Sequence, residues 1–123
     1  MSDPTAVPAG SGTLSIHRTD NRLAIVGHCK TPADREHLRA AVEHALASLQ
    51  VERPELILDV GRAMYLDVSM LTALIGIARR CVDCGLVLAL EGVNAETLKA
   101  LAETKIDQVL GRYGARIAPA GPT

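Results

Sequence analysis

The stretch from Leu56 to Gly85 constrains the fold more than any other part of the sequence. It opens with the apolar run Leu56-Ile57-Leu58, which is typical of a strand covered on both faces. Apolar residues then recur at the spacing of one helical stripe: Leu71, Leu74, Ile75, Ala78 and Val82. Gly85 follows the stripe, as glycine often does just past a helix C-terminus. The stretch predicts a strand that ends at Asp59, a connection, and a helix with Ser69 in its first turn.

Before this central unit we expect a hairpin and a helix. Residues 14–17 and 23–26 are short strand candidates, and the turn chemistry of residues 19–21 predicts an antiparallel hairpin between them. The pair Thr31-Pro32 predicts a helix start, a capping residue followed by proline, and this helix runs to about Leu49. Its expected buried stripe is Leu38, Ala41, Val42, Ala45, Leu46 and Leu49.

After the central helix the pattern continues with residues 86–90, a second continuous apolar strand. Asn94 is expected to cap a third helix that carries Leu98, Leu101 and Ala102, and its apolar face continues through Ile106 and Val109 to Leu110. Residues 113–118 can hold a short final strand. The element order predicts an α/β fold, a single domain whose mixed sheet has four to five strands. It combines an N-terminal antiparallel hairpin with parallel β-α-β crossovers.

Parallel strands place their carboxyl ends at one edge of the sheet, where ligands and partners commonly bind. Three segments are expected to gather at that edge: residues 27–30, 59–69 and 91–93. We expect residues 1–12 to be a disordered leader, because they are rich in Pro, Ala, Gly and Ser. The domain is expected to span 13–118, followed by a flexible tail at 119–123.

Composition excludes several functions. The net charge is −1 and no basic patch stands out, so nucleic acid is not an expected partner. Aromatic residues make up 2 % of the chain, which argues against base stacking. The N-terminus lacks a signal-peptide pattern and no apolar run is long enough to span a bilayer, so we expect a cytoplasmic protein without membrane insertion.

The three cysteines do not form an even disulfide framework, and reduced thiols are the simplest interpretation. Cys81 and Cys84 match the C-x-x-C pattern, but they lie at a helix C-terminus, where the dipole opposes the thiolate. Zinc would need further ligands, and Cys29 lies at the opposite edge. We expect Cys81 to be an apolar flanking residue and Cys84 a helix-end residue, with no metal and no cofactor.

The first turn of the central helix carries the most informative side chain. A hydroxyl at Ser69 can accept a phosphate, which free N–H groups and the helix dipole favour. The alternative is a structural cap, because serine is common near helix starts. A strip of small residues continues from it at helical spacing and leads to a cation: Ser69, Thr72, Ala73, Gly76 and Arg80. Small side chains let a partner's backbone approach closely, and a mid-helix glycine, which costs about 1 kcal/mol against alanine, suggests such a reason.

Two catalytic interpretations are weaker. Asp59 at a strand end suggests a phosphoacceptor, but the paired acidic site and the later lysine that this chemistry needs are missing, so a capping or turn role is expected. Asp67, Ser69 and His28 suggest nucleophilic catalysis, but the residues around Ser69 are not the small ones of a nucleophile elbow. We therefore expect a protein that is not an enzyme.

From about Leu14 to Leu110 the chain resembles a STAS domain, the fold of bacterial anti-sigma factor antagonists. The resemblance rests on residues 56–60 followed by Tyr65-Leu66-Asp67-Val68-Ser69, which look like the family's strand and its D-S-S-G-L signature, and on the strand that follows Gly85. By position, Asp67 matches the motif aspartate, Ser69 the regulatory phosphoserine and Leu71 the leucine.

The chain departs from the family pattern at three places. Val68 stands where the signature has its first serine, and Met70 stands where it has glycine. The loop that resembles the family's G-E-L-D reads Gly27-His28-Cys29-Lys30. These departures bear on the partner rather than on the fold.

The resemblance implies a binding switch. The unphosphorylated protein would bind an anti-sigma factor of the serine-kinase type and free a sigma factor, and phosphorylation of Ser69 would break the complex. The partner-binding residues would be Lys30, Asp67, Ser69, Met70, Thr72, Ala73 and Gly76. The protein itself would be a monomer or a weak homodimer.

Two alternatives stay open. A STAS accessory subunit of a membrane lipid transporter would dock the same edge on a nucleotide-binding ATPase subunit, without phosphorylation. A small-molecule hydrolase is the third.

Overall fold

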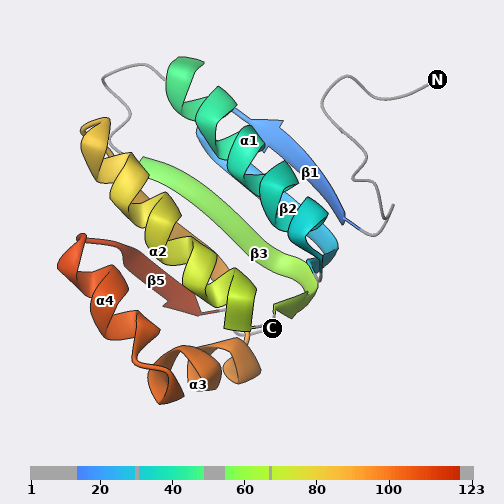
Figure 1. Cartoon of the computed structure of the whole chain (residues 1–123), viewed down its shortest axis with the longest axis vertical. Helices are drawn as coiled ribbons and strands as arrows, with labels where there is room; N and C mark the ends of the chain where they lie inside the picture. The colour runs from blue at the N-terminus through green and yellow to red at the C-terminus, as the bar shows by residue number, and fades with distance from the viewer. Residues whose placement is uncertain (1–13, 30, 49–54, 67, 120–123) are drawn as a thin grey trace.

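The computed structural model describes residues 14–29, 31–48, 55–66 and 68–119. Its elements form one α/β domain (Figure 1). In chain order they are β1 (Leu14–Thr19), β2 (Arg22–Cys29), α1 (Pro32–Ser48), β3 (Glu55–Leu66), α2 (Val68–Asp83), β4 (Val87–Val93), α3 (Ala95–Glu103), α4 (Ile106–Arg112) and β5 (Arg116–Pro119). The predicted leader at 1–12, residues 120–123 of the predicted tail, Leu49, Lys30 and Asp67 lie outside the described residues. Pro119, the first residue of the predicted tail, is instead the last residue of β5.

The sheet has five strands in the order β1-β2-β3-β4-β5. β1 pairs with β2 antiparallel, and the other neighbours are parallel, which confirms the predicted hairpin and crossovers. The helices lie together on one face of the sheet (Figure 1). Leu23, Leu58 and Leu90 lie opposite one another on three neighbouring strands and are at most 1 % exposed, so this face carries the core.

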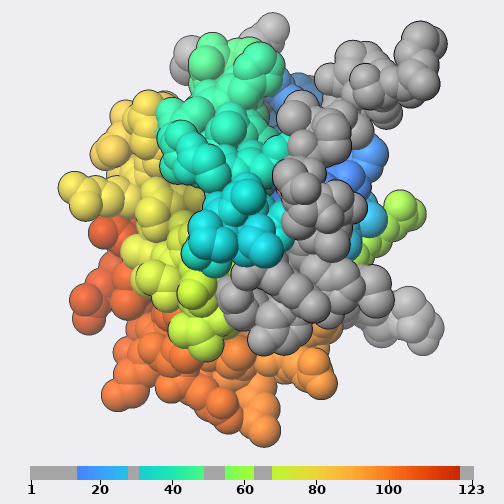
Figure 2. All heavy atoms as spheres, turned by 45° about the vertical axis from the view of Figure 1, so that its right-hand side comes forward, coloured from blue at the N-terminus to red at the C-terminus, as the bar shows by residue number. Residues whose placement is uncertain are grey.

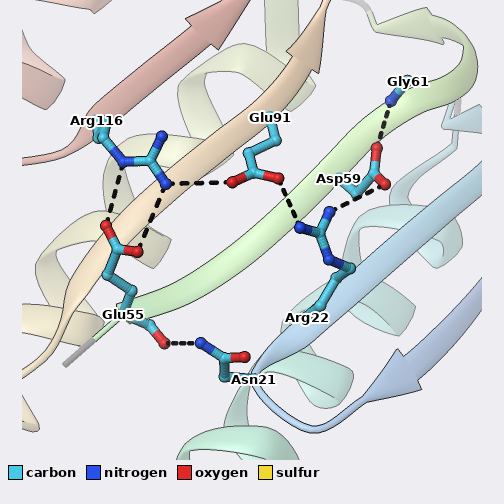
Figure 3. Close-up of polar contacts among 7 residues, drawn as sticks. All are labelled: Asn21, Arg22, Glu55, Asp59, Gly61, Glu91 and Arg116. Atoms are coloured by element: carbon cyan, nitrogen blue, oxygen red, sulfur yellow. Dashed lines mark hydrogen bonds and ion pairs between the residues drawn. The ribbon is translucent and has the colours of Figure 1, made fainter. Parts of the chain in front are cut away.

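The other face of the sheet carries charges, so the expectation that the strand at Leu56 is covered on both faces is wrong. Arg22 on β2 contacts Asp59 on β3 at 3.2 Å and Glu91 on β4 at 2.7 Å. Arg116 on β5 contacts Glu91 at 3.2 Å and Glu55 at 3.2 Å (Figure 3). Hydrogen bonds from Arg22 and then Arg116 lower the pKa of Glu91 below its ordinary value. The ion pairs thus join four strands across the face that the helices leave open.

β3 runs through Asp59 to Leu66, which corrects the prediction that the strand ends at Asp59. The pairing of β3 with β2 continues beyond a register shift that follows Asp59. At that shift Oδ1 of Asp59 accepts a hydrogen bond of 3.0 Å from the backbone N–H of Gly61. The turn chemistry expected of Asp59 is therefore present, but inside an irregular strand, where the carboxylate gives the N–H of Gly61 a hydrogen-bond partner.

α1 begins with a reciprocal cap. The N–H of Asp34 donates to Oγ1 of Thr31 at 3.1 Å, and the N–H of Thr31 donates to Oδ2 of Asp34 at 3.0 Å. This confirms the start predicted from Thr31-Pro32. The core side of the helix follows the predicted stripe, with four buried members and a partly buried Ala41: Leu38, Val42, Ala45 and Leu46.

α2 buries a stripe that is rotated from the predicted one. Leu71, Leu74 and Ala78 are in the core as predicted, and Met70, Ile77 and Cys81 join them. Val82 is 45 % exposed, so its predicted burial is wrong. The helix ends in a Schellman arrangement: the N–H of Leu86 donates to the carbonyl of Cys81, and Gly85 has a φ of +76°. Gly85 therefore closes the helix as the sequence indicates.

The C-terminal region contains two helices where the sequence predicts one. Lys105 adopts a left-handed φ of 61° and separates α3 from α4. The side chain of Asn94 accepts from the N–H of Thr97 at 2.8 Å, which confirms the predicted cap. Leu101 and Leu110 are buried, whereas Ala102 is exposed. Within the described ranges, no helix combines the length and apolar character that crossing a bilayer requires.

Gly92 should be required for the packing of β3 against β4. Its φ is +71°, and a Cβ placed on it would lie 2.8 Å from the Cα of Gly61. We expect Gly92→Ala to lower the free energy of unfolding by about 2 kcal/mol or more, because the alanine would introduce both backbone strain and steric overlap of its Cβ with Gly61. Gly111→Ala is the control, since a Cβ there meets nothing within 4 Å. Urea denaturation of the wild type and both variants measures the free energies of unfolding. A denaturation midpoint of Gly92→Ala equal to that of the wild type would contradict this packing.

The two thiols should behave as unrelated side chains. Cys81 is buried, and burial raises its pKa to about 12, whereas Cys84 is exposed. Under native conditions an alkylating agent should modify Cys84 and leave Cys81 unmodified until the protein unfolds. Peptide mapping by mass spectrometry reads each site. Equal labelling of both thiols, or about one zinc per purified chain, would show that they form a site after all.

Candidate functional site

The candidate site begins at the N-terminus of α2, at the carboxyl end of β3. Ser69 lies in the first turn of this helix and is exposed. The site lies on the predicted edge because α2 returns across the sheet from the end of a parallel strand. Lys30 and Asp67, expected to contribute to the same edge, lie outside the described residues.

A strip of small side chains runs along the outer face of α2, as the helical spacing predicts. Ser69, Thr72 and Gly76 are exposed, and Ala73 is half-buried. A Cβ added at Gly76 would meet nothing within 4 Å, so no packing contact explains the glycine. The strip therefore leaves the helix backbone open to a close approach from outside.

Met70 does not belong to this strip. It is 0 % exposed and packs in the core, which corrects its expected role as a partner-contacting residue. The reason is geometric: Met70 shares a helix face with Leu74 and Ile77, the face that meets the sheet. Val68, the other departure from the family signature, is 61 % exposed. The apolar side chain beside Ser69 that a partner can touch is thus Val68.

α1 turns the strip into a groove. The two helices lie side by side and run in the same direction, and Figure 2 shows them adjoining at the surface, α1 in teal and α2 in yellow-green. The groove between them has a volume of about 800 Å³. Its lining comes from both helices: Pro32, Arg35, Glu36, Leu38, Arg39, Val42 and Glu43 of α1, and Ser69, Thr72, Ala73, Gly76, Ile77 and Arg80 of α2.

Charged side chains stand over the apolar and small residues of this groove. Nε of Arg80 donates to Glu43 at 2.8 Å and ties α2 to α1, and this hydrogen bond raises the pKa of Arg80. Arg39 pairs with Glu36 within α1. Arg35, in contrast, makes no ion pair with any carboxylate in the part of the chain that the structure describes. The groove thus has one uncompensated cation, near the end that holds Ser69.

The α1 wall is the part of the site that sequence reasoning missed. Arg35, Arg39 and Glu43 flank the predicted buried stripe of α1, which is where a solvated face is expected. No sequence pattern indicates which neighbour such a face meets. One sequence signal was available. The small residues lie on α2 and the charged flank lies on α1, and these two helices follow the neighbouring parallel strands β3 and β2.

The groove offers small, apolar and charged side chains. Among the described residues its lining contains no histidine, cysteine or aspartate, and its two carboxylates, Glu36 and Glu43, are each paired with an arginine. No cluster of three or more His, Cys, Asp or Glu side chains suited to a metal occurs among the described residues. A partly apolar floor with a charged rim is a common surface for a polypeptide partner.

Comparison with known proteins shows what the chain is similar to. No protein-family model matches it, and no curated protein matches it in sequence. Among solved structures, a match is the crystal structure of the diguanylate cyclase SiaD in complex with its activator SiaC from Pseudomonas aeruginosa; the matching protein is SiaC. That match has 21 % identity and a TM-score of 0.60, and it covers 93 % of this chain and 98 % of the other.

A second match is the NMR structure of the protein TM1081. It has 14 % identity and a TM-score of 0.56, with 85 % of this chain and 79 % of the other covered. Both matches cover most of each chain, so this domain and the two proteins share the same overall fold. SiaC, one of the two, acts by binding an enzyme.

Proposed function

We propose that this protein is a regulatory binding module that docks a partner in the groove between α1 and α2 and is switched by phosphorylation of Ser69. The observation that carries the proposal is the position of Ser69: it is exposed at the end of a groove floored by small side chains. A partner that lies along this groove must pass over Ser69. The likeness in fold to SiaC, an activator bound to its enzyme, supports a regulatory role through protein binding.

The resemblance in sequence to STAS domains supports a finer statement. The protein is an anti-sigma factor antagonist, not an enzyme, and its partner is an anti-sigma factor with serine kinase activity. The partner transfers the γ-phosphoryl group of ATP to Oγ of Ser69; the O–P bond forms, the hydroxyl proton passes to a base of the kinase, and ADP leaves. The phosphate adds a charge of about −1.5 to −2 at a packed surface, which ends the complex and frees the anti-sigma factor.

Ser69 should be the switch. Ser69→Glu should fold normally, because its side chain is exposed and a negative charge is favourable in the first helical turn, yet bind the partner at least about tenfold more weakly. Ser69→Ala should bind like the wild type and resist inactivation by kinase and ATP. The measurement is incubation with the co-purified anti-sigma kinase and ATP, a binding titration, and mapping of phosphate by mass spectrometry.

Two outcomes would end the phosphorylation proposal. One is phosphate on Thr72 alone, and the other is full binding by Ser69→Glu without any phosphate on the wild type. Co-purification with a transporter ATPase instead of a kinase would identify the chain as a docking subunit of a membrane transport complex.

The groove itself should be the docking surface. Gly76→Leu places a bulky side chain on its floor, at an exposed position where an added Cβ would meet nothing within 4 Å, so we expect an intact domain and a loss of partner binding of about tenfold or more. Gly76→Ala is the matched control, which should stabilise the helix by up to about 1 kcal/mol and change binding little. Thermal unfolding and a binding titration separate the two effects. Unchanged affinity in Gly76→Leu would place the interface elsewhere.

A further inference from the structure

We infer that a phosphate on Ser69 is bound by Arg35 across the groove, so that phosphorylation fills the docking surface from within. The inference rests on the proposed phosphorylation of Ser69 and assigns the group that receives the phosphate. It follows from three properties of Arg35: its charge is uncompensated, it lines the same groove as Ser69, and it lies at the same end of the two helices.

The first property separates Arg35 from the other arginines of the groove. Arg39 is engaged by Glu36 and Arg80 by Glu43, so neither is free for an added anion. Arg35 is half-buried and has no ion-pair partner among the described residues. A planar guanidinium without a partner can take two oxygens of a phosphate in a bidentate pair, the strongest kind of charge-assisted hydrogen bonding.

The helix register brings Arg35 and Ser69 together. The 2.8 Å contact between Arg80 and Glu43 sets the axial position of α2 against α1. Because both helices run in the same direction with the same rise per residue, counting back along both places Ser69 level with Pro32 and Thr72 level with Arg35. Arg35 is thus about 5 Å along the axis from the level of Ser69. Side chains on a helix tilt toward its N-terminus, so the Cα–Cβ bond of Arg35 tilts toward the level of Ser69, within reach of a long arginine side chain.

A phosphate held in this way changes the surface without changing the fold. It places a charged group and the Arg35 side chain over the first small residues of the strip, Thr72 and Ala73, where the partner's backbone would otherwise approach. The core beneath is not involved, since Met70 and Leu74 face the sheet. Inactivation then comes from occupation of the groove, and repulsion of the partner's charges adds to it.

The test measures the phosphate directly and needs no partner. Phosphoserine is introduced at position 69 by genetic encoding, and its ³¹P resonance is titrated with pH in the wild type, Arg35→Gln, Arg35→Lys and Arg79→Gln. The second pKa of phosphoserine is about 6, and a nearby cation favours the dianion. We expect the titration midpoint to lie about half a pH unit lower in the wild type than in Arg35→Gln. Arg35→Lys should fall between them.

Arg79→Gln is the matched control. It removes the same charge from an exposed position of α2 outside the groove lining, so its midpoint should equal that of the wild type. Circular dichroism verifies that each variant is folded. Equal midpoints for the wild type and Arg35→Gln, or equal shifts in Arg35→Gln and Arg79→Gln, would overturn the assignment of Arg35. The phosphorylation of Ser69 by a kinase would then still stand on its own mass-spectrometric test, because the encoded phosphoserine bypasses the kinase.

Discussion

The packing of α2 on the sheet is the contact on which the rest of the molecule depends. Met70, Leu74 and Ile77 bury one side of the helix against the strands, and this fixes which side remains outside. Each of these side chains loses about 1.5–3 kcal/mol of transfer free energy if it is exposed, so rotation of the helix about its axis is strongly disfavoured. The small residues on the opposite side cannot compete for the core. The outward position of Ser69 is therefore a consequence of apolar burial on the far side of the same helix.

The groove follows from a mismatch between neighbouring helices. α1 presents long charged side chains toward α2, whereas α2 presents Ala73 and Gly76, which fill little space. Close packing would close such a gap if the facing residues were Leu or Ile. The ion pair between Glu43 and Arg80 joins the helices at the far end, and no ion pair between described residues joins α1 to α2 at the end near Ser69. Gly76 lies in the middle of α2, where a glycine costs about 1 kcal/mol relative to alanine. A Cβ at this position would meet nothing within 4 Å, so no intramolecular contact explains the glycine.

Sequence reasoning reached the fold because local signals agree with one another. The cap at Thr31, the glycine after α2 and the alternation of strands and helices each predict the element that the structure shows. It failed where the outcome depends on how two elements pack or pair with each other. The apolar stripe of α2 was predicted from spacing, but whether Met70 or Val82 enters the core depends on how the helix is set against the sheet. Asp59 carries a turn signal, yet the pairing of β2 with β3 persists past it. The wall of the groove on α1 was invisible for the same reason.

A rigid support also restricts how such a site can be regulated. β3 and β4 are locked by the close approach of Gly61 and Gly92, and the ion pairs around Arg22 and Arg116 join the strands on the open face. The helices that carry Ser69 and Arg35 thus pack on a sheet whose strands are joined by these contacts. A phosphate on Ser69 adds a local electrostatic interaction at the N-terminus of α2. Moving the packed helices would expose apolar side chains, and exposing each of them costs a free energy similar to or larger than that interaction. Regulation at this surface is therefore expected to act on what occupies the groove, and the unpaired guanidinium of Arg35 is the group in the groove lining that can respond to an added anion without disturbing an existing ion pair.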